Sequence, residues 1–478
     1  MNVFPKFADK STTKKWIIQV FSQKSMHFSQ KCRKYSWITP EYLHICNFFS
    51  IFARFFETKM LFYFLLIRIA ALFGHKKARA LVEGQKKTAG IPLSEYAHCV
   101  WIHVASVGEF EQARTLIEML RNSKIRKLEN LKIVVTFFSP SGYEARKNYD
   151  KADAVLYLPF ATRRNAKRFI EALQPQMAIF VKYEFWPAYL RELKKRNIRT
   201  YSISSIFRPN QIFFRPWGKG QLRLLKCFTH IYVQDEASRR LLAEHGIHNS
   251  SVAGDTRFDR VAEVQMDNGQ NAKNLSPIEY FVKGCERVVV VGSTWPEDEV
   301  LLEKYMKVQR DNVQSTKLIL VPHEIDEAHL HFIFNLFKGR YVKYSAVRSQ
   351  NSVISNESRK NILERADVLV IDTMGLLSSV YRFGQAAYIG GGFGVGIHNT
   401  IEAAVYGVPV VFGPNYTRFR EAQGLIDAGA ARSIRNYDEL ENALNNALDE
   451  HATIGAKAAE YVQSELGATE KIVKEIFD

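Results

Sequence analysis

The chain has 478 residues, 46% of them hydrophobic, and its 66 Lys and Arg against 49 Asp and Glu give a formal net charge of +17. This length predicts two or three domains with large cores. Five cysteines without CxxC or metal-type spacing argue against a disulfide framework or a zinc site and fit a reducing compartment. The basic balance favours an anionic partner, whether nucleic acid, an acidic membrane surface or a phosphorylated substrate.

The N-terminal part divides into a basic extension, residues 1–59, and an apolar run. The first 40 residues hold eight Lys or Arg and one Asp, a net charge of +7. The run from Met60 to residue 74 is apolar except for Arg68, and a basic cluster follows it. The run is shorter than the ~20 residues that span a bilayer, and a signal peptide would have its basic residues first. We therefore expect a membrane-associated helix at residues 60–80 that lies in the membrane face.

Other interpretations of this region stay open. With Phe48–Phe56 added, the run could form a single span or a spanning hairpin, and it could also be a buried core helix. A separate hypothesis is that Met60 is the natural start and that residues 1–59 are a mis-called extension.

From Cys99 onward, apolar strand patterns alternate with helical ones. Strands spaced by helical patterns of 10–15 residues indicate βαβ units and a parallel sheet. A polar stretch within residues 263–285 is typical of a linker. We therefore predict an α/β fold of two Rossmann-like domains, 81–262 and 286–478, that face each other across a ligand cleft. The predicted strands are 100–106, 131–138, 154–159, 176–183, 199–204, 230–235, 287–294, 317–323, 368–373, 386–390 and 408–413.

Candidate catalytic residues follow the strands of the first half, where open α/β sheets place their sites. Glu109 stands in a turn with Ser106 and Gly108, and the glycine would let the loop bend and bring the carboxylate into the cleft as a general base. Glu184 follows a later strand. The alternatives are that Glu109 is only stabilised at a helix N-terminus and that Glu184 only caps the next helix.

Further candidates lie at other strand ends. The turn with Ser139, Ser141 and Gly142 is suited to anion binding, although an ordinary helix N-cap is the alternative. In the second half we expect Ser293 and Thr294 to cap a helix, and the next strands end in Pro322-His323 and Met374-Gly375. The alternatives, which are the more common ones for these residue types, are that His323 is an ordinary structural histidine and that Met374 is a core residue. Because HExxH, DxD, GxSxG and Walker patterns are absent, we predict neither a metal nor an acyl-enzyme.

A glycine loop is the most informative feature of the second half. Glycines 390, 391, 392, 394 and 396 follow a strand, and a helix is expected to open near Asn399 and Thr400 and to run to Gly407. Glycines let a backbone approach a phosphate, and a helix N-terminus attracts it. Glu402, one turn into the helix, could accept hydrogen bonds from a ribose. The alternative is a βαβ corner whose glycines only permit tight packing.

Together these segments resemble the 3-deoxy-D-manno-octulosonic acid (Kdo) transferases of Gram-negative bacteria. The resemblance extends from about Met60 to the C-terminus, with the motifs in the family's order. The matching segments are ASVGE (105–109), SPSGYE (139–144), YEFWP (183–187), GDTRFD (254–259), GSTWPEDE (292–299), DTMG (372–375) and GIHNTIEAAVYGVPVVFGP (396–414).

The resemblance implies a GT-B glycosyltransferase whose N-terminal domain takes the acceptor and whose C-terminal domain takes CMP-Kdo. It implies inverting transfer of Kdo to a lipid A precursor of the lipid IVA type, at the cytoplasmic face of the inner membrane, without a metal or another cofactor. In the family's pattern Glu109 is the base and Glu184 a second essential carboxylate. The implied substrate-binding and donor-binding positions are Ser106, Gly108, Ser139, Ser141, Gly142, Ser293, Thr294, Pro322, His323, Met374, Gly375, Gly392, His398, Asn399 and Glu402.

The chain departs from the family pattern at three places. Lys182 stands where many members carry an acidic residue. The segment VPHEIDEAH (321–329) lacks the arginine that serves the donor phosphate, for which Arg257, Arg418 or Arg420 could substitute. The glycine before the His-Asn pair is also shifted, because Ile397 separates Gly396 from His398.

Two other functions are compatible with the sequence. Another GT-B enzyme, such as a lipid-linked N-acetylglucosaminyltransferase or a nucleotide-sugar epimerase, would share the glycine loop but use a UDP-sugar. A basic, membrane-associated nucleic-acid-binding protein lacks support, because no RRM, KH or helix-turn-helix signature is present. We therefore predict CMP-Kdo, a lipid A precursor and the anionic inner-membrane surface as partners, and no nucleic acid.

Overall fold

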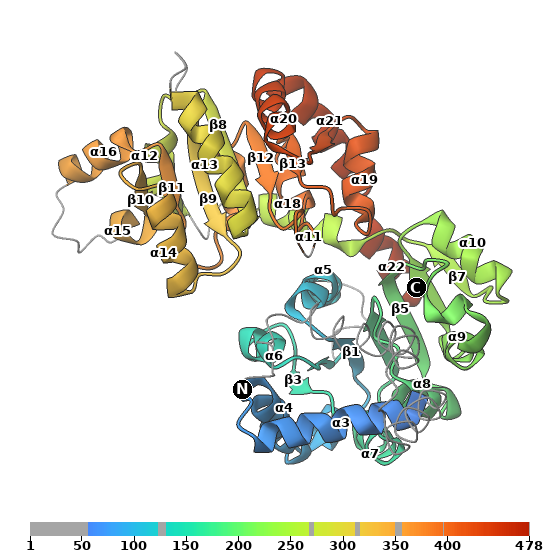
Figure 1. Cartoon of the computed structure of the whole chain (residues 1–478). Coiled ribbons are helices and arrows are strands. Elements are labelled where there is room, and N and C mark those ends of the chain that lie inside the picture. The colour runs from blue at the N-terminus through green and yellow to red at the C-terminus, as the bar shows by residue number, and fades with distance from the viewer. Residues whose placement is uncertain are drawn as a thin grey trace, which may run out of the picture.

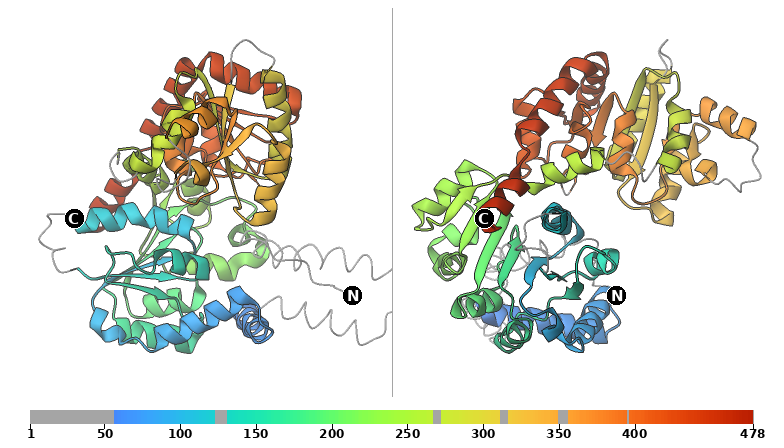
Figure 2. Two further views of the ribbon diagram at one scale, coloured as in Figure 1. Left: turned by 90° about the vertical axis from the view of Figure 1, so that its left-hand side faces the viewer. Right: turned by 180° about the vertical axis from the view of Figure 1, so that it is seen from behind.

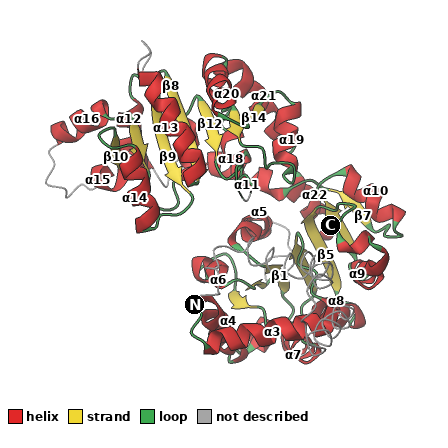
Figure 3. Ribbon diagram, in the orientation of Figure 1, coloured by secondary structure: helices red, strands yellow, loops and turns green. Residues whose placement is uncertain are grey.

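The computed structural model describes residues 56–122, 131–266, 272–310, 316–348, 356–394 and 396–477. Two α/β domains, each built on a parallel sheet with helices on both faces, follow one another along the chain (Figures 1 and 3). Most strands are short and rich in apolar residues, and most of their residues are buried, as expected where helices cover both faces of a parallel sheet. The prediction of two parallel-sheet α/β domains is therefore confirmed.

The N-terminal sheet has the strand order β3-β2-β1-β4-β5-β6-β7. Its strands are β1 (Val100–Val104), β2 (Ile133–Phe137), β3 (Ala154–Tyr157), β4 (Met177–Val181), β5 (Arg199–Ser205), β6 (His230–Val233) and β7 (Ser250–Val252). The helices of this domain are α3 (Phe56–Leu72), α4 (Lys76–Ala89), α5 (Val107–Asn122), α6 (Pro140–Arg146), α7 (Arg163–Leu173), α8 (Pro187–Lys195), α9 (Lys219–Leu225) and α10 (Glu236–Glu244). The order reverses between β1 and β4, so the loops that follow these two strands lie at a switch point.

The C-terminal sheet has the order β10-β11-β9-β8-β12-β13-β14. Its strands are β8 (Arg287–Thr294), β9 (Thr316–Pro322), β10 (Tyr341–Lys343), β11 (Val368–Val370), β12 (Ala386–Ile389), β13 (Val410–Phe412) and β14 (Ala431–Ser433). Its helices are α12 (Ala272–Val282), α13 (Pro296–Arg310), α14 (Glu327–Leu336), α15 (Tyr344–Arg348), α16 (Asn356–Arg365), α17 (Leu377–Val380), α18 (Ile401–Ala404), α19 (Arg420–Asp427), α20 (Tyr437–Asp449) and α21 (His451–Ser464). Here the switch point lies between β8 and β12, where the glycine loop begins.

Helices at the predicted domain boundaries are placed by their apolar faces. Helix α11 (Thr256–Met266) contributes Phe258 to the core of the C-terminal domain, and α12 contributes Ile278 and Phe281, although α12 falls in the predicted linker. The last helix, α22 (Ala468–Phe477), returns to the N-terminal domain and packs against α5 through Ile472 and Ile476 (Figure 2). The chain therefore crosses between the domains twice.

The predicted helix over residues 60–80 is two helices, α3 and α4, because the chain turns at Gly74, whose φ of +83° favours glycine. Phe64 of α3 packs on Phe160, while five apolar side chains of α3 and the turn face solvent. They are Leu65, Leu66, Ile69, Leu72 and Phe73. Among the described residues, no helix combines the length and the apolar character needed to cross a membrane. The hypothesis about the extension falls on residues that, up to residue 55, lie outside the described part.

Candidate functional site

A cavity of about 1320 Å³ lies where the two domains meet. The N-terminal domain lines it with Ser106, Gly108 and Glu109, which follow β1, and with Lys182, which follows β4. The C-terminal domain lines it with Gly375, Asn399 and Glu402. The topology explains this arrangement, because both parallel sheets direct the loops at their switch points toward the same space.

Glu109 is the third residue of α5, and its carboxylate lines the cavity. Its Oε2 accepts a hydrogen bond from the Ala105 N–H at 2.5 Å, and its own N–H donates to Ser106 Oγ at 3.4 Å. The carboxylate thus bonds the N-terminal end of its helix and also faces the cleft. The expectation that Gly108 lets the loop bend is wrong. Gly108 lies in the first turn of α5 without a positive φ, and a Cβ there would meet nothing within 4 Å.

Glu184 is buried in a different cluster of polar side chains. Its side chain is 3% exposed, and Oε2 accepts from Trp186 Nε1 at 2.7 Å and lies 3.3 Å from His103 Nε2. His103 Nδ1 lies 2.8 Å from Thr136 Oγ1, which fixes the imidazole from its other side. Helix α8 begins at Pro187 without a side-chain cap, so the alternative that Glu184 caps this helix is wrong. Glu184 is not among the residues that line the cavity.

The turn with Ser139, Ser141 and Gly142 forms an ordinary N-cap. Ser139 Oγ accepts from the Gly142 N–H at 3.2 Å and lies 2.8 Å from Ser141 Oγ. A Cβ at Gly142 would lie 2.7 Å from the ring of Phe137, so packing requires this glycine. The turn does not line the cavity, and α6 is only seven residues long.

The glycine loop permits close packing of the backbone. A Cβ at Gly392 would lie 2.5 Å from Gly413 Cα, and one at Gly390 would lie 2.4 Å from Ser293 O. At these two positions the packing alternative is confirmed. Gly391, with φ +87°, donates its N–H to Asp298 Oδ2 at 2.9 Å.

Asp298 was not identified from the sequence, although it stands in the acidic first turn of α13. Its carboxylate is 1% exposed and also accepts from Tyr388 Oη at 2.7 Å and from the Trp295 N–H at 3.0 Å. The expected caps Ser293 and Thr294 are wrong. Ser293 adopts φ +56°, and Thr294 donates its hydroxyl to Glu299 at 2.7 Å. Asp298 therefore joins the start of α13 to the glycine loop.

The residues after the glycine loop form two hydrogen bonds and one ring stack. Asn399 Oδ1 accepts from the Ile401 N–H at 3.2 Å, and its Nδ2 donates to Glu402 Oε1 at 2.9 Å. Burial raises the pKa of Glu402, although the Asn399 amide lowers it. His398 stacks on His323 with ring centroids 4.3 Å apart. The helix expected to run to Gly407 is shorter, since α18 ends at Ala404 and turns follow.

His323 and Met374 differ in burial and contacts. His323 follows Pro322, the last residue of β9, and also stacks on Trp295 at 4.8 Å. The alternative that Met374 is a core residue is wrong, because its side chain is 81% exposed. Gly375 beside it adopts φ +90° at the cavity wall.

Across the described ranges, no group of three or more His, Cys, Asp or Glu side chains is arranged to hold a metal ion.

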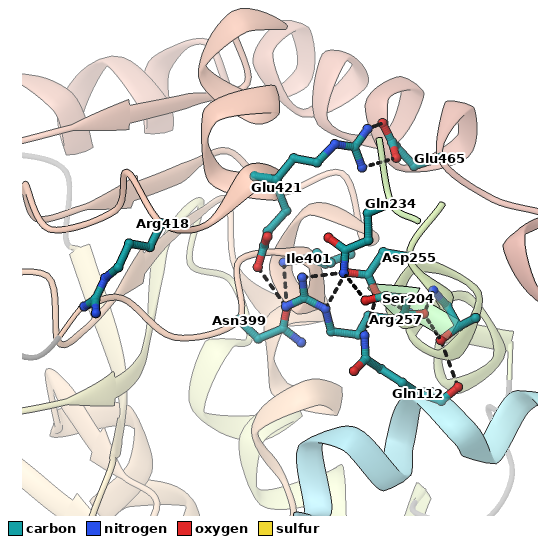
Figure 4. Close-up of polar contacts among 12 residues, drawn as sticks. Gln112, Ser204, Gln234, Asp255, Arg257, Asn399, Ile401, Arg418, Glu421 and Glu465 are labelled. Carbon is teal, nitrogen blue, oxygen red and sulfur yellow. Dashed lines mark hydrogen bonds and ion pairs between the residues drawn. The ribbon is translucent and has the colours of Figure 1, made fainter. Parts of the chain in front are cut away.

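An ion-pair network joins the domains beside the cavity (Figure 4). Arg257 donates to Asp255 Oδ2 at 2.7 and 2.8 Å and to Glu421 Oε1 at 2.8 Å, and Gln112 of α5 donates to Asp255 Oδ1 at 2.7 Å. Burial opposes the charge of Asp255, but Arg257 and Lys182 hold its pKa at about 2. Asp255 is therefore ionised across the neutral range.

Two of the cations considered for the donor phosphate, Arg257 and Arg420, pair with carboxylates. Arg257 is shared between Asp255 and Glu421, and Arg420 pairs with Glu465 at 2.6 and 2.8 Å. Arg418 points away from Arg257 in Figure 4 and lies beside the glycine loop, since a Cβ at Gly396 would lie 3.1 Å from its Nη2. Its role toward the phosphate stays a prediction.

Known proteins resemble this chain in sequence and in fold. Residues 73–260 match the family model described as 3-Deoxy-D-manno-octulosonic-acid transferase (kdotransferase). The 3-deoxy-D-manno-octulosonic acid transferase of Rickettsia prowazekii is 27% identical over 391 residues, 80% of this chain and 79% of that protein. The transferase of the same name from Aquifex aeolicus is 27% identical over 355 residues, 73% of this chain and 86% of that protein.

Among solved structures, the UDP-GlcNAc 2-epimerase of Neisseria meningitidis matches with a TM-score of 0.55 at 14% identity, covering 78% of this chain and 98% of that one. This likeness concerns the fold alone. The motifs, the matched domain and the relatives agree, and the resemblance predicted from the sequence is confirmed: the chain is a glycosyltransferase related to the Kdo transferases.

Proposed function

We propose that this protein transfers Kdo from CMP-Kdo to a lipid A precursor of the lipid IVA type, with inversion at the anomeric carbon, during synthesis of the lipopolysaccharide core. The observation that carries the proposal is the interdomain cavity. It brings Glu109 of one domain and the Asn399–Glu402 pair of the other to a single space. In this proposal the two domains each supply one part of the transfer site.

Glu109 is the proposed general base. An acceptor hydroxyl would give its proton to the Glu109 carboxylate while its oxygen forms the new bond to the anomeric carbon of Kdo. The bond from that carbon to the phosphate oxygen breaks, and CMP leaves with the electron pair. The hydrogen bond from the Ala105 N–H at 2.5 Å holds the carboxylate in position. Attack from the face opposite to the leaving group produces inversion, as in the inverting hydrolases.

The proposed donor site is the wall formed by Gly375, Asn399 and Glu402. Ribose hydroxyls that donate to Glu402 would stabilise its ionised form, which burial disfavours in the free protein. The exposed Met374 is available to pack against the cytosine base of CMP. CMP carries one phosphate, so hydrogen-bond donors and cations of the protein can stabilise the leaving group, and we expect transfer without a metal.

Helix α3 supports an acceptor that comes from a membrane. It packs near Phe138, Phe160 and Trp186, which follow strands β2, β3 and β4 at the same sheet edge as Glu109. Its exposed apolar side chains, with Leu72 and Phe73 85% and 87% exposed, would enter the headgroup region, and the basic start of α4 would meet anionic lipids. We therefore propose that the protein works at the cytoplasmic face of the inner membrane.

The proposal is tested by incubating the protein with freshly made CMP-Kdo and a tetra-acylated lipid A precursor in EDTA. The mass of the product is then measured by mass spectrometry. We expect a mass increase of one or more Kdo units, with NMR of the new linkage showing inversion. Parallel reactions contain excess CMP or UDP as competitors. Inhibition by CMP alone supports the proposal, whereas inhibition by UDP alone and no Kdo product would favour the UDP-sugar enzyme instead.

A further inference from the structure

The cations that line the interdomain cavity differ in whether a carboxylate already neutralises them. Among the described residues, four arginines line the cavity, and each forms an ion pair within the protein: Arg114 with Glu118, Arg146 with Glu111, Arg257 with Asp255 and Glu421, and Arg260 with Glu111 and Glu263. The fifth lining cation is Lys182. It forms no ion pair with any residue in the described part of the chain.

The backbone holds Lys182 in an unusual conformation. Its φ is +56°, a left-handed value that costs a lysine on the order of 1 kcal/mol or more. Two hydrogen bonds fix the residue there: its N–H donates to Ile203 O at 2.9 Å, and its carbonyl accepts from Ser205 Oγ at 3.0 Å. Strain of this kind persists where the surrounding structure enforces it, and it is concentrated at functional sites.

The surroundings leave the charge of Lys182 available. The nearby carboxylates Asp255 and Glu421 are both bonded to Arg257, and Glu109 is bonded to a backbone N–H. Burial lowers the pKa of the Lys182 amine, and Arg257 lowers it further, while these carboxylates raise it. Lys182 is half-buried in the cavity wall, so an anion that enters the cavity can form the ion pair that its ammonium lacks.

We propose that Lys182 is a donor-positioning residue whose ammonium binds an oxyanion of the nucleotide-activated sugar acid. This inference rests on the proposed function and deepens it. Two groups of CMP-Kdo have the required chemistry, the phosphate of the nucleotide and the carboxylate of the sugar. Lys182 follows β4, which lies next to β1, and the start of α5 with Glu109 follows β1. It is therefore placed to hold the donor against the wall that carries the base.

The test compares wild type, Lys182→Met and Lys182→Arg by isothermal titration with CMP and with freshly made CMP-Kdo. Met keeps the length of the side chain and removes the charge, and Arg restores a cation. The matched control is Lys147→Met, an exposed lysine that does not line the cavity. Circular dichroism and thermal unfolding establish that each variant is folded. Loss of a charged hydrogen bond predicts about 10- to 100-fold weaker donor binding by Lys182→Met, with part of the affinity restored in Lys182→Arg.

The two ligands identify the group that Lys182 binds. Equal weakening of CMP and CMP-Kdo assigns the phosphate, and weakening of CMP-Kdo alone assigns the carboxylate. If Lys182→Met binds both ligands as wild type does, or if only the KM for the acceptor rises, the inference is overturned while the proposed function stands. Wild-type protein that binds neither ligand would overturn the proposed function and this inference with it.

Discussion

The interdomain ion pairs of Arg257 provide a quantitative test of how the two domains are held together. Replacing Arg257 by Met leaves Asp255 and Glu421, which are only 1% and 3% exposed, without their partner. The lowering of the pKa of Asp255 from 3.8 to about 2 corresponds to about 2 kcal/mol of stabilisation. With Glu421 also left uncompensated, we expect Arg257→Met to reduce the free energy of unfolding by about 3–5 kcal/mol at pH 7.

The effect has a defined pH dependence. An aspartate with a depressed pKa stabilises the fold above its ordinary pKa of about 3.9, and this contribution is lost as the pH falls toward 2. The stability difference between wild type and Arg257→Met should therefore be complete at pH 6–7 and shrink below about pH 4. Urea unfolding followed by far-UV circular dichroism measures it at each pH.

The control for this experiment is Arg240→Met, because Arg240 is 69% exposed and lies 4.0 Å from Glu236. Removing such a surface pair should change stability by less than about 0.5 kcal/mol. A second variant, Glu421→Gln, and the double variant give the coupling energy between Arg257 and Glu421. A loss of less than about 1 kcal/mol in Arg257→Met, or no coupling with Glu421, would refute the assignment of this network as the joint between the domains.

Three further changes test other parts of the structure. Gly392→Ala places a Cβ 2.5 Å from Gly413 Cα, so thermal unfolding should show a loss of about 1–3 kcal/mol. Burial disfavours protonated His329, but the Glu299 carboxylate at 2.9 Å outweighs this effect and raises the pKa of His329. The stability advantage of wild type over His329→Gln should therefore be complete below about pH 6.5, and it should decline as the pH rises through the raised pKa. Phe73→Ser removes an 87% exposed aromatic side chain and should weaken co-sedimentation with anionic vesicles about tenfold or more.

The control for Gly392→Ala comes from the same chain, and each of the other two changes has a result that would contradict it. Gly220→Ala, where a Cβ would meet nothing within 4 Å, should be neutral or stabilising by up to about 1 kcal/mol. An advantage over His329→Gln that grows with rising pH would contradict the sign of the proposed pairing. Equal vesicle binding by wild type and Phe73→Ser would show that this end of α3 does not enter the lipid.

The sequence was sufficient to predict the layers of the fold. Runs of β-branched residues such as those in Arg287–Thr294 predict a buried strand. The alternation of such runs with helical patterns indicates a parallel sheet. Because a parallel sheet gathers its loops at one edge, the polar residues after the strands could be identified as candidates. Glu109, Gly375, Asn399 and Glu402 do line one cavity.

The remaining features depend on contacts between distant parts of the chain. The apolar face of α22 does not reveal which domain it will cover, and Ile472 packs in the N-terminal core. Glu184 cannot be recognised as buried without His103 and Trp186, which fold around it. A glycine needed for packing, such as Gly392, has the same sequence signature as one that admits a phosphate, because both require the absence of a Cβ.

The central claim is that the Glu109 carboxylate in the interdomain cavity takes the proton from the acceptor. It is tested most directly by single-turnover transfer from CMP-Kdo, with wild type, Glu109→Gln and the exposed control Glu144→Gln side by side. We expect Glu109→Gln to slow transfer by about 10²- to 10⁴-fold with donor binding and folding unchanged, and Glu144→Gln to retain the wild-type rate. Transfer by Glu109→Gln at the wild-type rate would contradict the claim.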